Sequence, residues 1–290
     1  ILRDISNLKN RKTSYQENST HKLAMSQLFS INGQVAILTG GTNGIGLGYA
    51  KGLASADLDQ LILTYRSEST LEKAKKIIHE VNPNVQIDGI KIDFLKDEED
   101  EIITKIVEES YKLSKTSNID ILVNNAGITE RYPFEDFPQD KFDDVIKVDL
   151  NIPVKLTKAI GRKMLETNTK GKIVFTASLL SFQGGMLSTP YAISKGALKQ
   201  FTQAVSNEWS SRGIRVNSIA PGYIKTNLTD SMSEENKKIV DLRIPMKRWG
   251  NPDDFMGPIV YLTSDASKYV TGDTLLVDGG WMGRYIHEIY

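Results

Sequence analysis

A tyrosine and a lysine stand four residues apart, at Tyr191 and Lys195, and a serine lies upstream at Ser178. Residues four apart on a helix share one face, so the Tyr191 hydroxyl and the Lys195 ammonium are expected to lie close together. A free tyrosine has a pKa of about 10, and a nearby ammonium is expected to lower it. Tyr191 could then exchange a proton with a substrate oxygen that Ser178 orients by a hydrogen bond. Taken alone, the pair could equally be a packed aromatic residue and a surface charge.

A glycine-rich segment near the start of the folded pattern points to a bound cofactor. The segment TGGTNGIG, residues 39–46, follows an apolar run and precedes a helical one. Glycines there let the backbone turn sharply and approach a pyrophosphate, while free N–H groups at the helix N-terminus attract its negative charge. A tight turn without a ligand is the alternative, but the strand before it and the helix after it favour a dinucleotide. The cofactor-binding residues predicted in this loop are Gly40, Thr42, Asn43, Gly44, Ile45 and Gly46.

The end of the second apolar run predicts which nicotinamide cofactor is bound. NAD-binding proteins usually carry a carboxylate there for the ribose 2′-hydroxyl, whereas a nearby arginine accommodates the 2′-phosphate of NADP. Here Thr64 fills the acidic position, Arg66 follows, and no acid occurs before Glu68. We therefore expect NADP, with Arg66 as a contact and NAD as the alternative cofactor. Arg66 could also be an ordinary solvated residue at a helix start.

Short apolar runs alternate with amphipathic ones along most of the chain. The runs are rich in Val, Ile and Leu, as is typical of strands buried on both faces, and they cover residues 35–39, 61–65, 85–92, 119–124, 172–178, 214–220 and 274–278. Alternation of strands and helices predicts the α/β class: a single Rossmann-type, doubly wound domain with a seven-stranded parallel sheet and helices on both faces. We assign this domain to residues 29–290, and residues 1–28 to a disordered N-terminal tail or an added extension.

Composition excludes several other kinds of function. Lysine plus arginine equals aspartate plus glutamate, 36 each, so neither a nucleic acid nor a membrane surface is expected as a partner. The chain has no cysteine and three scattered histidines, so we expect no metal site. No apolar run is long enough to span a membrane, and residues 1–24 lack the apolar centre of a secretory signal. A cytoplasmic location follows by default.

Four separated motifs together resemble the short-chain dehydrogenase/reductase family. They are TGGTNGIG (39–46), NNAG (124–127), Ser178 with YAISK (191–195), and PGYIKT (221–226), and the resemblance covers roughly residues 30–284. It implies that Ser178, Tyr191 and Lys195 are catalytic and that Tyr191 and Lys195 also meet the cofactor. Asn124 would mainly brace the sheet. The further cofactor contacts that it implies are Asp93, Asn125, Ala126, Gly127, Pro221, Gly222, Ile224 and Thr226.

One position departs from the family's pattern. A helix asparagine usually completes the catalytic group by anchoring a water that links the lysine to solvent. In VDLNIPVKLTKA the corresponding position holds Asp149, with Asn151 two residues later. We assign the role to Asp149 by position, although a shift of the helix could bring Asn151 there instead. An aspartate could still hold a water, but its charge would alter the effect of Lys195 on Tyr191.

The resemblance is greatest to the branch that contains 2-dehydro-3-deoxy-D-gluconate 5-dehydrogenase and gluconate 5-dehydrogenase. It implies a small-molecule substrate, an open-chain sugar acid whose secondary alcohol and ketone are interconverted. Gln183 and Arg131 are the predicted substrate contacts. Residues 226–245 resemble a substrate lid, and its segment 226–238 is polar with few apolar anchors. The alternatives are a 3-oxoacyl or general carbonyl reductase, and a non-catalytic protein that senses NADP. The family commonly forms homotetramers, so a homo-oligomer is expected.

Overall fold

The computed structural model describes residues 25–226, 229 and 232–284. Seven strands, most of them rich in β-branched and other apolar side chains, form one parallel sheet in the order β3-β2-β1-β4-β5-β6-β7. Their bounds are β1 (Val35–Leu38), β2 (Gln60–Tyr65), β3 (Gln86–Lys91), β4 (Ile121–Asn124), β5 (Lys172–Thr176), β6 (Arg215–Pro221) and β7 (Thr274–Val277). The predicted seven-stranded parallel sheet is therefore confirmed, with strand boundaries shifted by a few residues at most.

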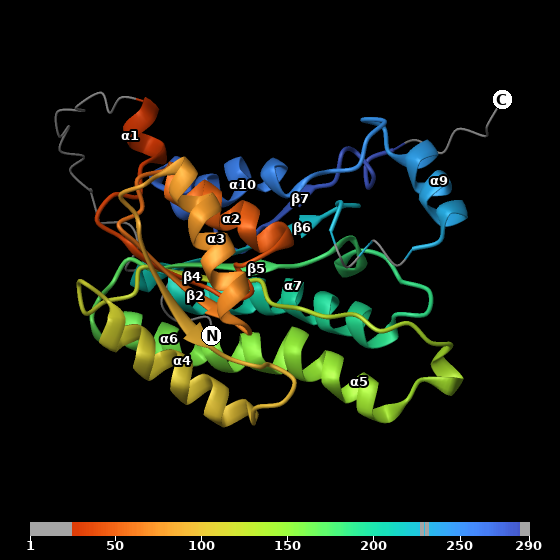
Figure 1. The fold of residues 1–290 in the computed structure, drawn as a ribbon, viewed down its shortest axis with the longest axis horizontal. Helices are drawn as coiled ribbons and strands as arrows, with labels where there is room; N and C mark the ends of the chain where they lie inside the picture. The colour runs from red at the N-terminus through yellow and green to blue at the C-terminus, as the bar shows by residue number, and fades with distance from the viewer. Residues whose placement is uncertain (1–24, 227–228, 230–231, 285–290) are drawn as a thin grey trace, which may run out of the picture.

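Helices cover both faces of the sheet, as a strand–helix alternation requires (Figure 1). On one face pack α2 (Gly44–Ser55), α3 (Glu68–Val81) and α10 (Met256–Thr263). On the other lie α4 (Glu99–Leu113), α5 (Gln139–Ile146), α6 (Ile152–Glu166) and α7 (Thr189–Trp209). Each layer encloses its own apolar core, one around Tyr49 and Phe255 and the other around Phe175 and Leu198. The strands that both layers cover are fully buried, which explains why their sequences do not alternate with polar residues.

The order of the strands places a crevice above the sheet. The chain winds outward from β1 through β2 to β3 on one side, and from β4 to β7 on the other. Between β1 and β4 the loops that follow the two strands therefore part in opposite directions. In open α/β sheets ligands bind at this point, beside the carboxyl ends of the strands.

A π-helical turn, η2 (Lys147–Asn151), joins α5 to α6 in one continuous helical run. Pro153 follows within the first turn of α6. Because proline has no N–H, it cannot bond to the carbonyl of Asp149 four residues earlier, and the helix widens at this turn. The Ile152 N–H instead bonds to the carbonyl of Lys147, five residues back. Asp149 is thereby presented from a widened turn, which is a frequent arrangement at functional sites.

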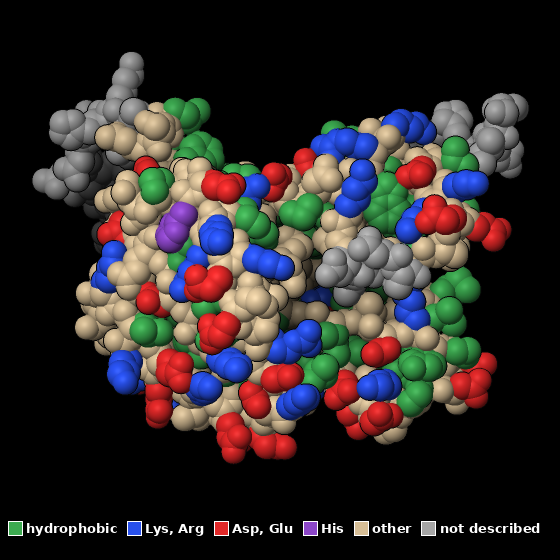
Figure 2. Space-filling view, in the orientation of Figure 1, with side chains coloured by type: hydrophobic (Ala, Val, Ile, Leu, Met, Phe, Trp, Pro, Cys, Tyr) green, Lys and Arg blue, Asp and Glu red, His purple; other side chains and the backbone are tan. Residues whose placement is uncertain are grey.

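Two smaller helices lie at the periphery: α1 (Met25–Phe29) and α9 (Glu234–Arg243). The last four residues of the predicted tail, 25–28, thus belong to a helix, and residues 1–24 lie outside the described part of the chain. Acidic and basic side chains are interspersed over the face seen in Figure 2, without one region of a single sign. Within the described residues, no helix combines the length and the apolar character that a bilayer crossing requires.

Candidate active site

A cavity of about 570 Å³ opens at the carboxyl ends of β1, β2, β4 and β5. It is lined by fifteen of the predicted residues: Gly40, Thr42, Asn43, Gly44, Ile45, Gly46, Arg66, Asp93, Asn125, Ala126, Gly127, Asp149, Tyr191, Lys195 and Thr226. The glycine loop and the Tyr191–Lys195 pair, about 150 residues apart in the sequence, therefore face the same space. Pro221, Gly222 and Ile224 do not line it, and Ser178, Gln183 and Arg131 do not line it either.

The glycine loop has the backbone shape that a phosphate-binding turn needs. Gly44 begins α2 with φ of +49°, in the left-handed region that favours glycine. A Cβ on Gly46 would lie 2.1 Å from the carbonyl oxygen of Gly40, so only glycine lets the loop close this tightly onto the helix. No side chain caps the N-terminus of α2, because Asn43 makes no capping hydrogen bond. The N–H groups of the first turn therefore remain available, which suits the pyrophosphate of a dinucleotide.

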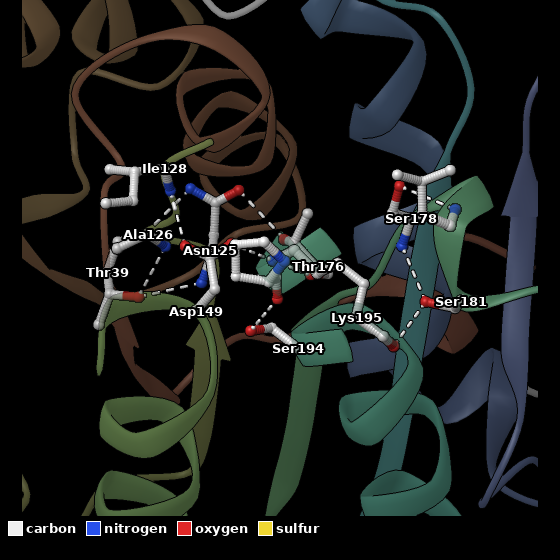
Figure 3. A network of polar contacts seen from close by, with 12 residues as sticks. Thr39, Asn125, Ala126, Ile128, Asp149, Thr176, Ser178, Ser181, Ser194 and Lys195 are labelled. Carbon is white, nitrogen blue, oxygen red and sulfur yellow. Dashed lines mark hydrogen bonds and ion pairs between the residues drawn. The ribbon is translucent and has the colours of Figure 1, made fainter. Parts of the chain in front are cut away.

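A hydroxyl network ties this loop to β4 and β5 (Figure 3). Thr39 Oγ1 accepts hydrogen bonds from the N–H groups of Asn125 and Ala126, at 3.0 and 3.1 Å. The Asn125 amide donates to the carbonyl of Gly40 at 3.0 Å and accepts from the Thr176 hydroxyl at 3.1 Å. Thr39 and Thr176 were not among the predicted site residues. Their positions at the ends of two buried strands could have suggested them, since strand ends of a parallel sheet meet at one edge.

The cavity wall beside β2 carries the residues predicted to select the cofactor. Thr64 is buried, and its Oγ1 accepts a hydrogen bond of 3.0 Å from the Gly40 N–H, so this side chain braces the glycine loop. Arg66 is exposed at the cavity wall, and no ion pair or hydrogen bond of its side chain occurs within the described residues. The next acid in the sequence, Glu68, accepts a hydrogen bond of 2.5 Å from the Tyr65 hydroxyl. The end of β2 therefore presents a cation to the cavity, with a threonine at the position where a carboxylate would repel a 2′-phosphate.

Lys195 lies on α7 and is almost wholly buried. Its Nζ donates to the carbonyl oxygen of Thr176 at 3.0 Å and lies 3.0 Å from Asp149 Oδ2. The Tyr191 ring centroid lies 5.3 Å from the same Nζ, as expected for residues one helical turn apart. Burial lowers the pKa of Lys195, but the charge of Asp149, the neighbouring Tyr191 and the hydrogen bond to Asp149 together outweigh it and raise that pKa. Lys195 is therefore held between two acceptors and directed towards Tyr191.

Asp149 has no exposed surface, and its two carboxylate oxygens have different partners. Oδ1 accepts a hydrogen bond of 2.7 Å from the Ile128 N–H, whereas Oδ2 has no contact other than the ion pair with Lys195. Burial raises the pKa of Asp149, and Lys195 opposes that rise. Asn151 faces away from this pair, because its amide donates to Glu99 at 3.0 Å. The structure thus brings Asp149, and not the alternative Asn151, to the lysine.

The expected lowering of the Tyr191 pKa is wrong. Burial raises this pKa, and the lowering effect of Lys195 is countered by the carboxylate of Asp149. A hydrogen bond between Tyr191 and Ser178 also lowers the pKa, but not enough to reverse the direction. The spacing of Tyr191 and Lys195 predicted only that the two side chains lie close together. Their burial, which decides the direction, depends on the layers packed around them.

Ser178 lies two residues after the end of β5 and caps a short turn, η3 (Leu179–Ser181). Its Oγ accepts a hydrogen bond of 3.1 Å from the Leu180 N–H, and its own N–H donates to Ser181 Oγ at 3.2 Å. The Ser181 hydroxyl donates in turn to the Lys195 carbonyl at 2.6 Å, so η3 is fastened to α7 (Figure 3). Ser181 was not predicted as a site residue, and nothing in its spacing signalled this bridge. It fixes the backbone of Ser178 relative to the helix that carries Tyr191.

The predicted substrate contacts lie apart from these groups. Gln183 and Arg131 are both exposed, and neither side chain makes a hydrogen bond or ion pair within the described residues. Their two loops are nevertheless linked, because the Tyr132 N–H donates to the Leu187 carbonyl at 2.9 Å. Leu187 has φ of +62°, a left-handed conformation that is unfavourable for a leucine. The linkage therefore holds a strained loop beside the site.

The predicted lid, residues 226–245, carries more apolar side chains than its polar segment 226–238 suggests. Residues 227–228 and 230–231 lie outside the described part of the chain. On α9, Val240 packs into a small apolar cluster with Leu179, Ile244, Trp249 and Trp281. Three further apolar side chains in and just after this helix are exposed: Ile239, Leu242 and Met246.

Comparison with known proteins agrees with this geometry. A family model described as "Enoyl-(Acyl carrier protein) reductase" (adh_short_C2) matches residues 40–282. The 2-dehydro-3-deoxy-D-gluconate 5-dehydrogenases of Pseudoalteromonas atlantica and Bacillus subtilis are 46% and 41% identical, over 90% and 88% of this chain and 100% and 97% of theirs. The structure of a gluconate 5-dehydrogenase from Burkholderia cenocepacia J2315, in complex with NADP and tartrate, superposes with a TM-score of 0.82 at 31% identity, covering 90% of this chain and all of that one. The chain therefore belongs to the short-chain dehydrogenase/reductase family of oxidoreductases, the family that its motifs resemble.

Proposed function

We propose that the protein is an NADP-dependent oxidoreductase that interconverts a secondary alcohol and a ketone on a sugar acid. The observation that carries the proposal is the shared cavity: the glycine loop and the Tyr191–Lys195 pair line one space. A dinucleotide held by the loop would have its nicotinamide end beside the tyrosine. The sugar-acid substrate is supported by the relatives, which are named for reactions at the 5-position of gluconate or of 2-dehydro-3-deoxy-D-gluconate.

In this mechanism the chain's own residues handle the proton and the orientation. When bound, the nicotinamide cofactor supplies or accepts the hydride. Ser178 and Tyr191 hold the substrate oxygen, and Tyr191 gives it a proton when the ketone is reduced or removes one when the alcohol is oxidised. Lys195, fixed by Thr176 and Asp149, lies beneath the tyrosine and is available to the nicotinamide ribose. The other proposed cofactor contacts are the lining residues of the cavity, with Arg66 at the 2′-phosphate of NADP.

Three residues of the PGYIKT segment take a supporting role in this proposal. Pro221 and Ile224 are buried, and a Cβ on Gly222 would lie 2.6 Å from the Cα of Asp278. They position Lys225 and Thr226, which do line the cavity. Contact of the cofactor with the Ile224 backbone remains part of the proposal.

A specific observation favours a second candidate substrate, a 3-oxoacyl thioester or another apolar carbonyl compound. The exposed Ile239, Leu242 and Met246 beside the lid offer an apolar surface that a sugar acid would not use. The family model that matches is also described by an acyl-carrier-protein reaction. We rank this candidate second, because the most similar relatives named above carry sugar-acid names at up to 46% identity.

The experiment is a spectrophotometric assay of NADPH and NADH oxidation and NADP and NAD reduction. The substrate panel contains keto sugar acids, the corresponding sugar acids, oxoacyl thioesters and simple diketones. We expect turnover of a sugar acid with NADP or NADPH, and its loss by about 100-fold or more in Tyr191→Phe, with cofactor binding retained. Cofactor binding without turnover of any compound would indicate the non-catalytic, NADP-sensing alternative. Activity that persists in Tyr191→Phe would reject Tyr191 as the acid and base.

A homo-oligomer, most simply a tetramer, is part of the same proposal, as is a cytoplasmic location. Exposed apolar side chains outside the lid support association, among them Ile193 on α7, Leu276 on β7 and Tyr269, which is fully exposed in the single chain. The apolar side chains of Leu198 and Val205 on α7 give no evidence for association, because they are buried within the chain itself. Light scattering coupled to size-exclusion chromatography measures the assembly, and a monomeric mass would refute it. Cell fractionation tests the location.

A further inference from the structure

Asp149 brings a buried carboxylate to the cavity wall, directly beside the ammonium of Lys195. The carboxylate has no exposed surface, and the Lys195 side chain is 4% exposed, so solvent screens their interaction little. Lys195 Nζ lies 3.0 Å from Oδ2, which has no other partner. A Cβ on Gly127 would lie 2.8 Å from the same oxygen, so glycine at that position makes room for the carboxylate. The pair is therefore a built feature of the cavity wall.

The groups that face Tyr191 come from three elements. Lys195 comes from α7, Asp149 from η2, and the uncharged Ser178 from the N-cap of η3. The charges around the phenol are therefore one positive and one negative. Their sum is zero whether the proton that they share resides on Nζ or on Oδ2. A neutral side chain at residue 149 would instead leave Lys195 as a single, uncompensated positive charge beside the tyrosine.

We propose that Asp149 is a positioning residue that neutralises Lys195 and so keeps Tyr191 protonated through neutral pH. The inference rests on the proposed function, because it concerns the proton that this reaction transfers. Reduction uses the phenol as a proton donor, and oxidation uses the phenolate as a proton acceptor. Asp149 therefore sets the pH at which the site passes from the first form to the second.

The sign of the pH dependence follows from these charge states. Burial raises the Tyr191 pKa, Lys195 lowers it and Asp149 raises it again. The proton-donating form therefore persists through neutral pH and is lost only as the pH rises through the elevated pKa. The rate of reduction should be level over neutral pH and decline in the alkaline range, whereas the rate of oxidation should increase there.

The distances set a lower limit on the effect of the Asp149 charge on the titration of Tyr191. Nζ lies 5.3 Å from the Tyr191 ring centroid and 3.0 Å from Oδ2, so Oδ2 is at most about 8 Å from the ring. At an effective dielectric constant of about 20, one charge at that distance shifts a titration by roughly 1.5 pH units. Asp149→Asn should therefore move the Tyr191 titration downward by about one to two pH units.

Two readouts test the inference. The first is the near-ultraviolet absorbance of the phenolate during a pH titration of the protein without cofactor, taken as the difference from Tyr191→Phe. The second is the pH profile of kcat/KM in both directions. Asp149→Asn should lower the inflection in both, and Asn151→Ala, on the same turn but bonded to Glu99, should leave both unchanged. Asp149→Ser serves if Asp149→Asn does not fold, and the same downward shift is expected.

An unchanged inflection in the folded Asp149 variants would overturn the inference, as would an equal shift in Asn151→Ala. The proposed function is tested separately from this inference. If the wild-type protein turns over none of the substrates, the absorbance titration still reports on Tyr191. A downward shift in that titration would then support the electrostatic role of Asp149 although the reaction remained unidentified.

Discussion

Replacing Arg66 by alanine should remove most of the preference for NADPH over NADH. Arg66 lines the cavity beside β2, and its side chain has no ion-pair partner within the described residues. The position two residues earlier is a threonine whose hydroxyl accepts from the Gly40 N–H, so no carboxylate there repels a 2′-phosphate. We therefore expect the guanidinium to be the group that distinguishes the two cofactors.

The size of the effect follows from the exposure of the arginine. A hydrogen bond to a charged group contributes roughly 1.5–3 kcal/mol, and solvent screening at an exposed site reduces this to about 1–2 kcal/mol. Since about 1.4 kcal/mol corresponds to a tenfold change in affinity, Arg66→Ala should weaken NADPH binding about 5- to 30-fold. NADH lacks the 2′-phosphate, so its affinity should change little. The loss should shrink as the salt concentration increases, because the interaction is screened.

Isothermal titration calorimetry with NADPH and NADH measures both affinities without requiring a substrate. Lys73→Ala is the matched control: it removes one exposed cation from α3, next to Arg66 in sequence, but Lys73 does not line the cavity. That variant should retain the wild-type ratio of the two dissociation constants. If Arg66→Ala also retains the ratio, Arg66 does not bind the 2′-phosphate, and the cofactor assignment from this wall is refuted.

Two further sets of variants test the glycine loop and the predicted substrate contacts. Gly46→Ala should abolish cofactor binding and lower the melting temperature, because its Cβ would collide with the Gly40 carbonyl. Gly196→Ala is the control: it lies on α7, no atom is near its new Cβ, and it should change neither quantity. Equal behaviour of the two variants would contradict this account of the loop. Arg131→Ala and Gln183→Ala should each raise KM for a sugar acid severalfold while the dissociation constant of NADPH stays unchanged. A KM that stays at the wild-type value in both would remove these exposed residues from the substrate site.

Much of the fold could be predicted because its signals are local. Short segments rich in Val, Ile and Leu mark most of the strands, of which the central ones are buried on both faces, and the turn chemistry of TGGTNGIG marks the start of α2. The gathering of Tyr191, Lys195 and the loop in one cavity follows from the rule that strand ends of a parallel sheet meet at one edge.

The other features of the site depend on side-chain packing, which the spacing of residues in the sequence does not reveal. The direction of the Tyr191 pKa is decided by burial, which arises from several layers at once. The choice between Asp149 and Asn151 depended on the widened turn that carries them, and Pro153 was the one local sign of it. Arg131 and Gln183 were assigned from their positions in the sequence; both are exposed, and their contact with a substrate stays a prediction.

The widened turn η2 also constrains how this segment can change in length. It holds one residue more than an α-helical turn would, so deleting a residue between Asp149 and Pro153 would let the helix close to regular geometry. Because the widened turn takes up its extra residue locally, α5 and α6 would then keep nearly the same register, and the side chains of the turn itself would move, so that Asp149 would no longer face Lys195. A deletion within regular α5 or α6 would instead rotate the flanking segments by about 100°. Single-residue deletions at 147–153 should therefore abolish activity while lowering the melting temperature less than deletions elsewhere in 139–166.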